Sequence, residues 1–177
     1  LFRCVERNLG WHEVIAEDLG YVTDSVRQLV RDSGFPGMKV LEFAFDSRDS
    51  GSANDYLPHN YNNNCWVYTG THDNMTTRQW FDTAPADAVA YAREYMNITA
   101  EEGDVWGMIR TAFASVSDTC IIPMQDFLEL GGEARMNFPG TLSDSNWTWR
   151  AKDDIMSKTL AKRILAMTKL YGRYCGK

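Results

Sequence analysis

The sequence contains little of what marks membrane, secreted or nucleic-acid-binding proteins. No run approaches the roughly 18 consecutive apolar residues of a membrane-spanning helix, so we expect no membrane segment. The 18 Lys and Arg are outnumbered by 24 Asp and Glu, and the net charge of -6 disfavours binding to nucleic acid, which needs a positive surface. The first residues show no signal-peptide pattern, and a cytoplasmic location is the expectation.

Cysteine and histidine are also scarce. Cys4, Cys65, Cys120 and Cys175 are far apart and form no CxxC pair, which is typical of neither a disulfide scaffold nor a zinc site. We expect free thiols in a reducing compartment, with one long-range disulfide as the alternative. The 3 histidines show no HExxH spacing, so we predict no metal site.

Short apolar segments bounded by Gly, Pro or polar residues recur along the chain and are typical of buried parallel strands. The predicted strands are residues 14–16, 38–45, 65–69 and 120–124.

Helical patterns alternate with these segments. Apolar faces, capping residues and terminal charges predict helices at 23–34, 85–96, 104–116 and 152–171. Strands that alternate with helices predict an α/β fold with a parallel sheet and covered faces.

Two architectures share this alternation. A complete (β/α)8 barrel takes about 250 residues, so 177 residues with about four strand-helix units predict roughly the second half of one. An open doubly wound sheet has the same periodicity, but the glycine fingerprint that such sheets often carry is missing. We see no internal repeat and no domain boundary.

Polar residues appear where the predicted strands end. Glu17 and Asp18 follow the first strand, His72 and Asp73 follow the third, and Asp126 follows the fourth. In a parallel barrel these strand ends form the active-site face, so the side chains should converge. A single acid at such a position is more often a helix cap, but several sites in phase favour a functional site.

The two acids Glu17 and Asp73 lie in different settings. Glu17 is flanked by Ile15, Ala16 and Leu19, so we expect partial shielding from water, which suits a proton donor. Asp73 lies in a more polar segment and should remain charged. One acid that gives a proton and one that faces developing positive charge are what glycoside chemistry requires. A pair of structural caps fits the spacing equally well.

Aromatic residues are abundant, with 6 Trp, 8 Tyr and 8 Phe. Aromatic rings can lie against the apolar faces of sugars, and polar groups such as the asparagines of residues 60–64 can bond sugar hydroxyls. Most aromatic residues belong to the core, so this composition supports a sugar site without identifying one.

Six co-linear motifs between residues 3 and 171 resemble the 4-alpha-glucanotransferases, also called amylomaltases or disproportionating enzymes. The motifs lie at residues 15–20, 34–41, 60–64, 68–74, 123–126 and 133–150. The resemblance implies a (β/α)8 barrel enzyme that transfers α-1,4-glucan segments between maltooligosaccharides, or to glucose, by a retaining double displacement with no organic cofactor.

The resemblance also implies roles for individual residues. Glu17 would be the general acid/base and Asp73 the transition-state stabiliser. The substrate-binding residues that it implies are Asp18, His72, Asn137 and Trp147. Met75 and Gln79 depart from the family pattern, which usually has Asp and Gly there.

The nucleophilic Asp of the family, in an Arg-x-Asp-His motif on the fourth strand, does not occur in this sequence. A retaining mechanism needs that nucleophile about 5 to 5.5 Å from the acid/base. We therefore expect residues 1–177 to form the C-terminal half of the barrel, with strands five to eight, and to be inactive alone.

A half barrel has unpaired edges, which predicts self-association or pairing with the missing N-terminal half. A half barrel that binds α-glucan without turnover is the alternative function. An α-glucan hydrolase would use similar carboxylates, and the preference for transfer comes from the resemblance.

Overall fold

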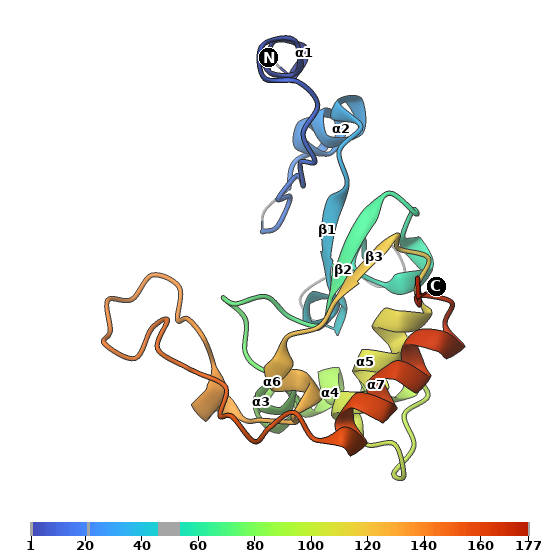
Figure 1. The fold of residues 1–177 in the computed structure, drawn as a ribbon, viewed down its shortest axis with the longest axis vertical. Coiled ribbons are helices and arrows are strands. Elements are labelled where there is room, and N and C mark those ends of the chain that lie inside the picture. Colours follow the sequence, from blue (N-terminus) through green and yellow to red (C-terminus); the bar gives the residue numbers. More distant parts are fainter. Residues whose placement is uncertain (1, 21, 46–53, 177) are drawn as a thin grey trace.

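The computed structural model describes residues 2–20, 22–45 and 54–176 (Figure 1). One parallel sheet lies at its centre, with the strand order β1-β2-β3. The strands are β1 (Gly37–Val40), β2 (Cys65–Tyr68) and β3 (Thr119–Ile121).

The α/β class and the parallel pairing are confirmed, but the prediction of about four strands is wrong for the described residues. The predicted strand 14–16 contributes only an isolated bridge from Ala16 to Gly37. The predicted strand 38–45 stops at Val40, where the 3-10 helix η1 (Leu41–Phe45) begins. The last strand stops before Pro123, whose missing N–H cannot continue a ladder.

Helices follow each strand. The α-helices are α1 (Phe2–Leu9), α2 (Asp24–Ser33), α3 (Thr77–Thr83), α4 (Ala86–Tyr95), α5 (Asp104–Ala114), α6 (Met124–Phe127) and α7 (Lys158–Leu170). Two further 3-10 helices are η3 (Pro58–Asn60) and η4 (Gly132–Ala134).

The predicted helices at 23–34, 85–96 and 104–116 are confirmed as α2, α4 and α5. Helix α2 has the expected caps, because the Thr23 side chain accepts from the backbone N–H of Val26, and Gly34 adopts a left-handed φ of 72°. Helix α7 begins later than predicted, since Ser157 and not an earlier residue caps it.

Helix α5 contributes to both hydrophobic clusters of the core. One side faces the sheet, where Met108 and Ala112 pack among apolar residues of η1, β2, α3 and α4. The other side, which includes Trp106 and Ile109, packs against α7, and Figure 1 shows the two helices side by side. Each fully buried apolar side chain of this size stabilises the fold by about 1.5–3 kcal/mol.

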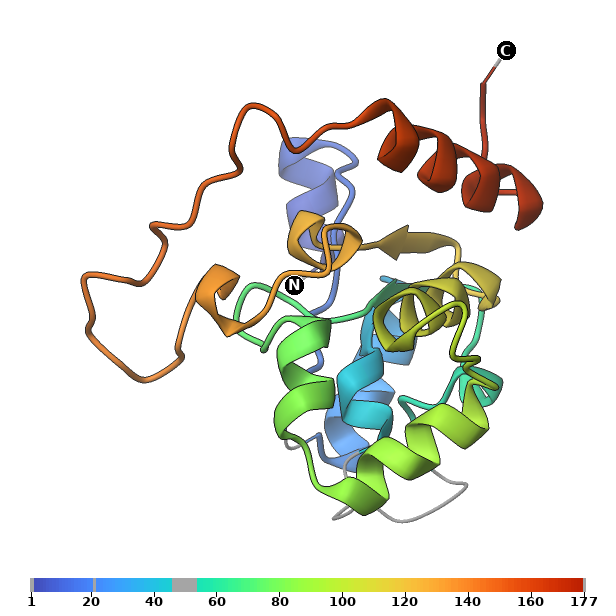
Figure 2. The ribbon, with the colours of Figure 1, turned by 90° about the horizontal axis from the view of Figure 1, so that it is seen from below.

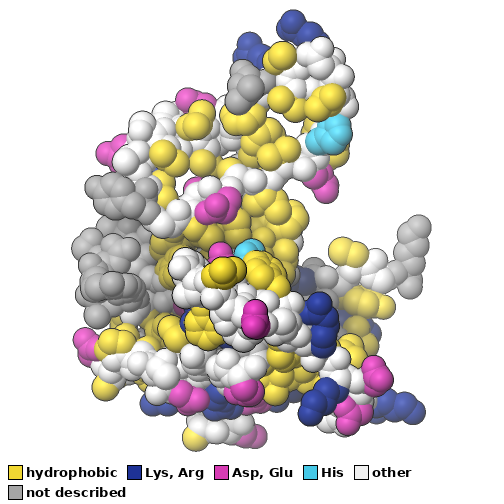
Figure 3. Space-filling model, turned by 90° about the vertical axis from the view of Figure 1, so that its left-hand side faces the viewer, with side chains coloured by type: hydrophobic (Ala, Val, Ile, Leu, Met, Phe, Trp, Pro, Cys, Tyr) yellow, Lys and Arg dark blue, Asp and Glu magenta, His cyan; other side chains and the backbone are white. Residues whose placement is uncertain are grey.

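The N-terminal elements lack a core of their own among the described residues. Helices α1 and α2 contain no buried residue, and Leu9 and Trp11 are 68% and 73% exposed. Figure 1 shows both helices projecting beyond the sheet, and Figure 3 shows a broad hydrophobic surface between this end and the rest of the molecule. These apolar side chains are therefore exposed to solvent in the described structure.

The four cysteines are free thiols, so the alternative of a long-range disulfide is not realised. Cys120, in β3, packs against both hydrophobic clusters, and burial raises its pKa to about 11. Within residues 2–20, 22–45 and 54–176, no helix is long and apolar enough to cross a membrane.

Candidate active site

A tight turn after β2 carries His72 and Asp73. The Asn74 Oδ1 atom accepts hydrogen bonds from the backbone N–H of Thr71 at 2.9 Å and from the Thr71 hydroxyl at 2.7 Å. The same hydroxyl accepts from the backbone N–H of Asp73 at 3.3 Å. These local bonds fix the turn at the carboxyl end of the sheet.

The loop between η4 and α7 returns to this turn and contacts it. Asn137 Nδ2 donates to Asp73 Oδ1 at 2.6 Å, and His72 Nε2 lies 3.4 Å from the same oxygen. The Trp147 ring lies against the His72 ring, with centroids 5.0 Å apart. The structure thus brings together four of the residues that the sequence singled out.

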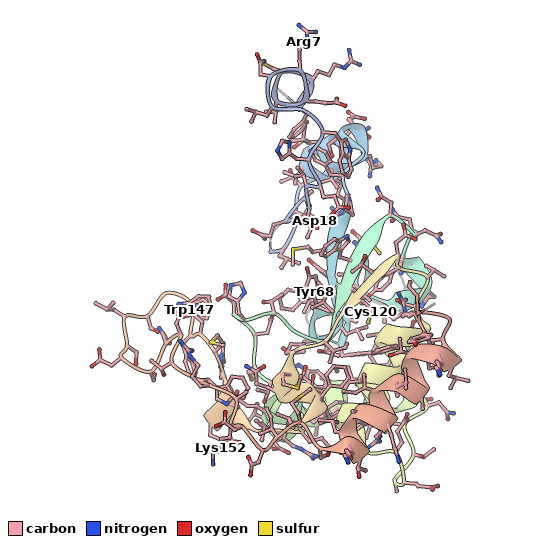
Figure 4. All side chains as sticks on the ribbon, in the orientation of Figure 1. Arg7, Asp18, Tyr68, Cys120, Trp147 and Lys152 are labelled. Atoms are coloured by element: carbon pink, nitrogen blue, oxygen red, sulfur yellow. The ribbon has the colours of Figure 1, made fainter. Side chains whose placement is uncertain are left out.

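The position of Trp147 is set by its loop. Its backbone N–H donates to the Met136 carbonyl at 2.7 Å, and its φ of 64° is uncommon for a bulky residue. Figures 1 and 2 show this loop extending away from the helices, and Figure 4 shows Trp147 on it. The side chain is 54% exposed, so its ring offers an apolar face to a ligand.

Glu17 lines the same pocket as His72 and Asp73. This open pocket measures about 720 Å³ and lies at the carboxyl ends of the strands. Apolar residues, among them Met38 and Tyr68, form part of its wall. Both predicted catalytic acids therefore border one cavity that is large enough for a sugar chain.

The partial shielding that we expected for Glu17 is not found, because its side chain is exposed. Its Oε1 atom accepts from the backbone N–H of Leu19 at 3.2 Å. The segment that carries Glu17 is joined to the sheet only by the bridge at Ala16, which leaves the carboxyl open to water in the described structure.

Asp18 points to the edge of β1 and not into the pocket with Glu17. Its Oδ1 atom accepts from the backbone N–H of Met38 at 2.7 Å, and a Cβ at Gly37 would come within 2.8 Å of Oδ2 (Figure 4). The carboxylate thus occupies the place of the carbonyl that a further paired strand would supply. Asp18 therefore has a structural role, in addition to the sugar-binding role that the resemblance implies.

Asp126, which the pattern placed on the active-site face, is instead 1% exposed and held in the interior. It accepts from the Thr69 hydroxyl at 2.5 Å and from the Thr77 backbone N–H at 2.8 Å. Burial raises its pKa, and these hydrogen bonds partly oppose that effect. Asp126 therefore joins the end of β2 to the start of α3. It borders a small cavity of about 150 Å³ that His72 also lines, and not the larger pocket of Glu17.

A second buried acid, Glu42, was missed by the sequence patterns. Glu42 is only 4% exposed. Burial, and after it the nearby Asp126, raise the pKa of Glu42 well above the ordinary range, while Arg135 opposes this shift. Glu42 lines a cavity of about 370 Å³ with Asp73 and Arg135. The apolar run around Glu42 predicted a strand, so nothing marked the carboxyl as part of the site.

The two departures from the family pattern are accommodated by packing. Met75 packs against the main core, and its sulfur accepts from the Thr83 hydroxyl at 3.5 Å. The Gln79 side chain lies beneath Gly132, where a Cβ would come within 2.8 Å of its Cδ atom. Neither residue displaces Asp73 from the pocket.

Metal ligands do not gather in the described ranges, where no group of three or more His, Cys, Asp or Glu residues is placed to hold a metal ion. Two carboxyls and an imidazole line the open pocket, and the Asn137 amide and the Trp147 indole contact Asp73 and His72. Such groups can move a proton, stabilise positive charge and bind a sugar ring.

Comparisons with known proteins agree with the resemblance. The 4-alpha-glucanotransferase of Clostridium butyricum is 50% identical over 174 residues, which cover 98% of this chain and 35% of that protein. The 4-alpha-glucanotransferase of Synechocystis is 47% identical, over 97% of this chain and 34% of that protein. The chain therefore spans about a third of the length of these relatives.

The structure is similar to the amylomaltase from Streptococcus agalactiae, which was solved in complex with acarbose. The TM-score is 0.90 at 36% identity, over 97% of this chain and 34% of that chain. A family model described as 4-alpha-glucanotransferase matches residues 1–157. This chain belongs to the 4-alpha-glucanotransferase family.

Proposed function

We propose that this chain carries the acid/base and the transition-state-stabilising carboxylate of an enzyme that transfers α-1,4-glucan segments to maltooligosaccharides or glucose. The supporting observation is the meeting of Asp73 and His72 with Asn137 and Trp147 at a pocket that Glu17 also lines. Membership of the 4-alpha-glucanotransferase family supports transfer over hydrolysis.

In the proposed mechanism Glu17 gives its proton to the glycosidic oxygen as the bond to the donor sugar breaks. Glu17 then accepts the proton of the acceptor hydroxyl in the second displacement. Asp73 faces the sugar carbon that becomes positively charged, and the amide of Asn137 fixes its carboxylate. The nucleophile comes from polypeptide outside this chain.

Substrate contacts are proposed for the groups around these acids. The exposed ring of Trp147 provides an apolar platform for a glucosyl unit, and His72 beneath it bonds hydroxyls at the cleavage point. Asn137 and Asp18 are also proposed to bind the substrate. No organic cofactor and no metal takes part in this proposal.

The proposed architecture is the second half of a (β/α)8 barrel, with this chain supplying strands five to eight. The single bridge at Ala16 marks where a further strand would extend, and the exposed apolar surface around Leu9 and Trp11 would be covered by the first half or by a second copy. Burial of this face would also shield Glu17. The free thiols support a cytoplasmic location.

The test is a maltotriose disproportionation assay that follows glucose and longer maltodextrins. We expect no products from the 177-residue chain alone, and both products when the chain replaces the matching third of the Clostridium butyricum relative. In that joined protein Glu17→Gln should lower kcat by about 100-fold or more, because it removes the proton donor at nearly constant size.

Four outcomes would contradict parts of this proposal. If Glu17→Gln keeps wild-type turnover, Glu17 is not the acid/base. If Asp73→Asn keeps it, Asp73 is not the transition-state stabiliser. Glucose without longer maltodextrins indicates a hydrolase. Glucan binding without any turnover in the joined protein favours the non-catalytic alternative.

A further inference from the structure

Arg135 connects the turn that carries Asp73 with the loop that carries Asn137. Its Nη2 atom donates to the Asp73 carbonyl at 2.8 Å, and its Nε atom donates to the Asn137 carbonyl at 2.9 Å. Asn137 in turn donates from Nδ2 to the Asp73 carboxylate at 2.6 Å. The three bonds close a ring that fixes both the backbone and the side chain of Asp73.

The surroundings of Arg135 hold its guanidinium in this position. The guanidinium carbon lies 4.3 Å from the centre of the Phe138 ring, and the residue is half-buried. Burial raises the pKa of the nearby Glu42 carboxyl, which disfavours its charged form as a competing partner for the guanidinium. Among the described residues, Arg135 donates its two hydrogen bonds to backbone carbonyl oxygens and not to a carboxylate.

Only a planar, multidentate donor suits this arrangement. The guanidinium presents Nε and Nη2 in a rigid fork, and each nitrogen reaches a carbonyl on a different chain segment. A lysine ammonium is a single point on a flexible stem and cannot hold both carbonyls in the same fixed directions. Substitution by lysine therefore keeps the charge and removes the fork.

We propose that Arg135 is a positioning residue for glucan transfer, which acts by aiming the Asp73 carboxylate and locking it to the loop of Asn137 and Trp147. The inference rests on the proposed function of Asp73. Arg135 itself touches no reacting atom. Its effect on turnover follows because a displacement of about 1 Å in a catalytic group can cost about 100-fold in rate.

The first test measures the ring directly in the 177-residue chain by two-dimensional NMR. The side-chain amide of Asn137 should resonate apart from those of exposed asparagines because it binds a carboxylate. Arg135→Lys should shift it toward the exposed asparagines, as Asp73→Ala should. The matched control is Arg78→Lys, since Arg78 is also half-buried but pairs with Glu129 at 2.6 Å, outside the ring.

An unchanged Asn137 amide in Arg135→Lys overturns the inference whatever the activity of the protein. Arg135→Gln, which keeps one amide donor, serves as the second variant if the lysine variant unfolds at a lower temperature than Arg78→Lys. A shift in either folded variant supports the ring.

The second test measures transfer in the protein joined to the upstream part of the Clostridium butyricum relative. Arg135→Lys should lower kcat by about 100-fold with KM changed by less than about twofold, and Arg78→Lys should keep both. Adding Asn137→Ala to Arg135→Lys should lower kcat little more than either change alone, because both residues hold the Asp73 carboxylate. Additive losses, or a kcat equal to that of Arg78→Lys, overturn the inference.

Failure of the proposed function would look different. If Asp73→Asn keeps full transfer, Asp73 is not the stabilising acid, while the Asn137 amide still reports whether Arg135 holds the ring.

Discussion

At the scale of single residues, the described site contains two kinds of carboxyl. Glu17 and Asp73 border the open pocket, whereas Glu42 and Asp126 lie in the interior behind it. The interior acids are costly to ionise because burial removes their hydration. Among the described residues, Glu42 Oε1 is one of two buried side-chain oxygen or nitrogen atoms without a hydrogen-bond partner. Glu42 is therefore the acid whose ionisation should weaken the fold.

The raised pKa of Glu42 predicts that the stability of a Glu42→Gln variant depends on pH differently from that of the wild type. The folded chain keeps the Glu42 proton at a pH where the unfolded chain has released it, because the pKa is raised well above its ordinary value only in the folded state. Unfolding of the wild type is thus favoured as the pH rises above the ordinary carboxyl range. Glu42→Gln carries no proton to lose, so it should gain about 1 kcal/mol or more relative to wild type between pH 4 and pH 7.

The measurement is chemical denaturation at pH 4, 5, 6 and 7. Glu101→Gln, at an exposed position, is the matched control and should follow the wild type across this range. A difference between Glu42→Gln and wild type that does not change with pH would show that Glu42 is ionised in the folded chain.

At the scale of elements, helices with clear end signals could be predicted from the sequence. Thr23 and Gly34 bound α2 as expected, because a side-chain acceptor and a residue free to adopt positive φ satisfy the helix ends locally. The start of α7 was misplaced because Asp153 and Asp154 resemble first-turn acids, yet only Ser157 makes the capping bond. Sequence alone did not show which of these polar residues caps the helix.

The strand prediction at 38–45 failed for a different reason. Leu41, Ala44 and Phe45 are buried, as a strand prediction requires, but they lie in a 3-10 helix. A short apolar run fits a buried strand and a buried turn of helix equally well. The choice depends on contacts with the rest of the fold, which periodicity does not contain.

The cap of α7 gives a prediction at this scale. The Ser157 hydroxyl accepts from the Leu160 backbone N–H at 3.1 Å, and Leu160 packs in the cluster that joins α7 to α5. Ser157→Ala should lower the free energy of unfolding by about 1 kcal/mol, whereas Ser157→Asp should restore it because aspartate is also a good cap. Denaturant titration of both variants is the measurement, and equal stability of all three proteins would contradict the assigned cap.

At the scale of the whole molecule, the site joins residues that are far apart in the sequence. Asn137 and Asp73 meet although 64 positions separate them, and Trp147 reaches His72 from the same loop. Strand-end position predicted His72 and Asp73, but only the family resemblance pointed to Asn137 and Trp147, since a loop leaves no periodic signal. The exposure of Glu17 could not be predicted, because its apolar sequence neighbours Ile15, Ala16 and Leu19 do not determine which other segments pack over its side chain.

The exposed apolar surface of the N-terminal elements leads to the last prediction. Leu9 is 68% exposed on a helix without buried residues, and Leu170 is 76% exposed at the end of α7 (Figure 1). If the N-terminal surface pairs with the first half of a barrel, Leu9→Asp should weaken that association by about 10-fold or more, because a charge at a buried interface loses its hydration. Leu170→Asp should leave it unchanged.

Association is measured by sedimentation of this chain with the separately produced upstream part of the Clostridium butyricum relative. The wild type and Leu170→Asp should form a one-to-one complex of the same affinity, and transfer of maltotriose should appear with complex formation. Equal weakening by both substitutions would indicate a general loss of solubility. A complex that forms equally well with Leu9→Asp would place the interface elsewhere, at the open sheet edges beside Ala16 and β3, where backbone groups and not apolar side chains would make the contact.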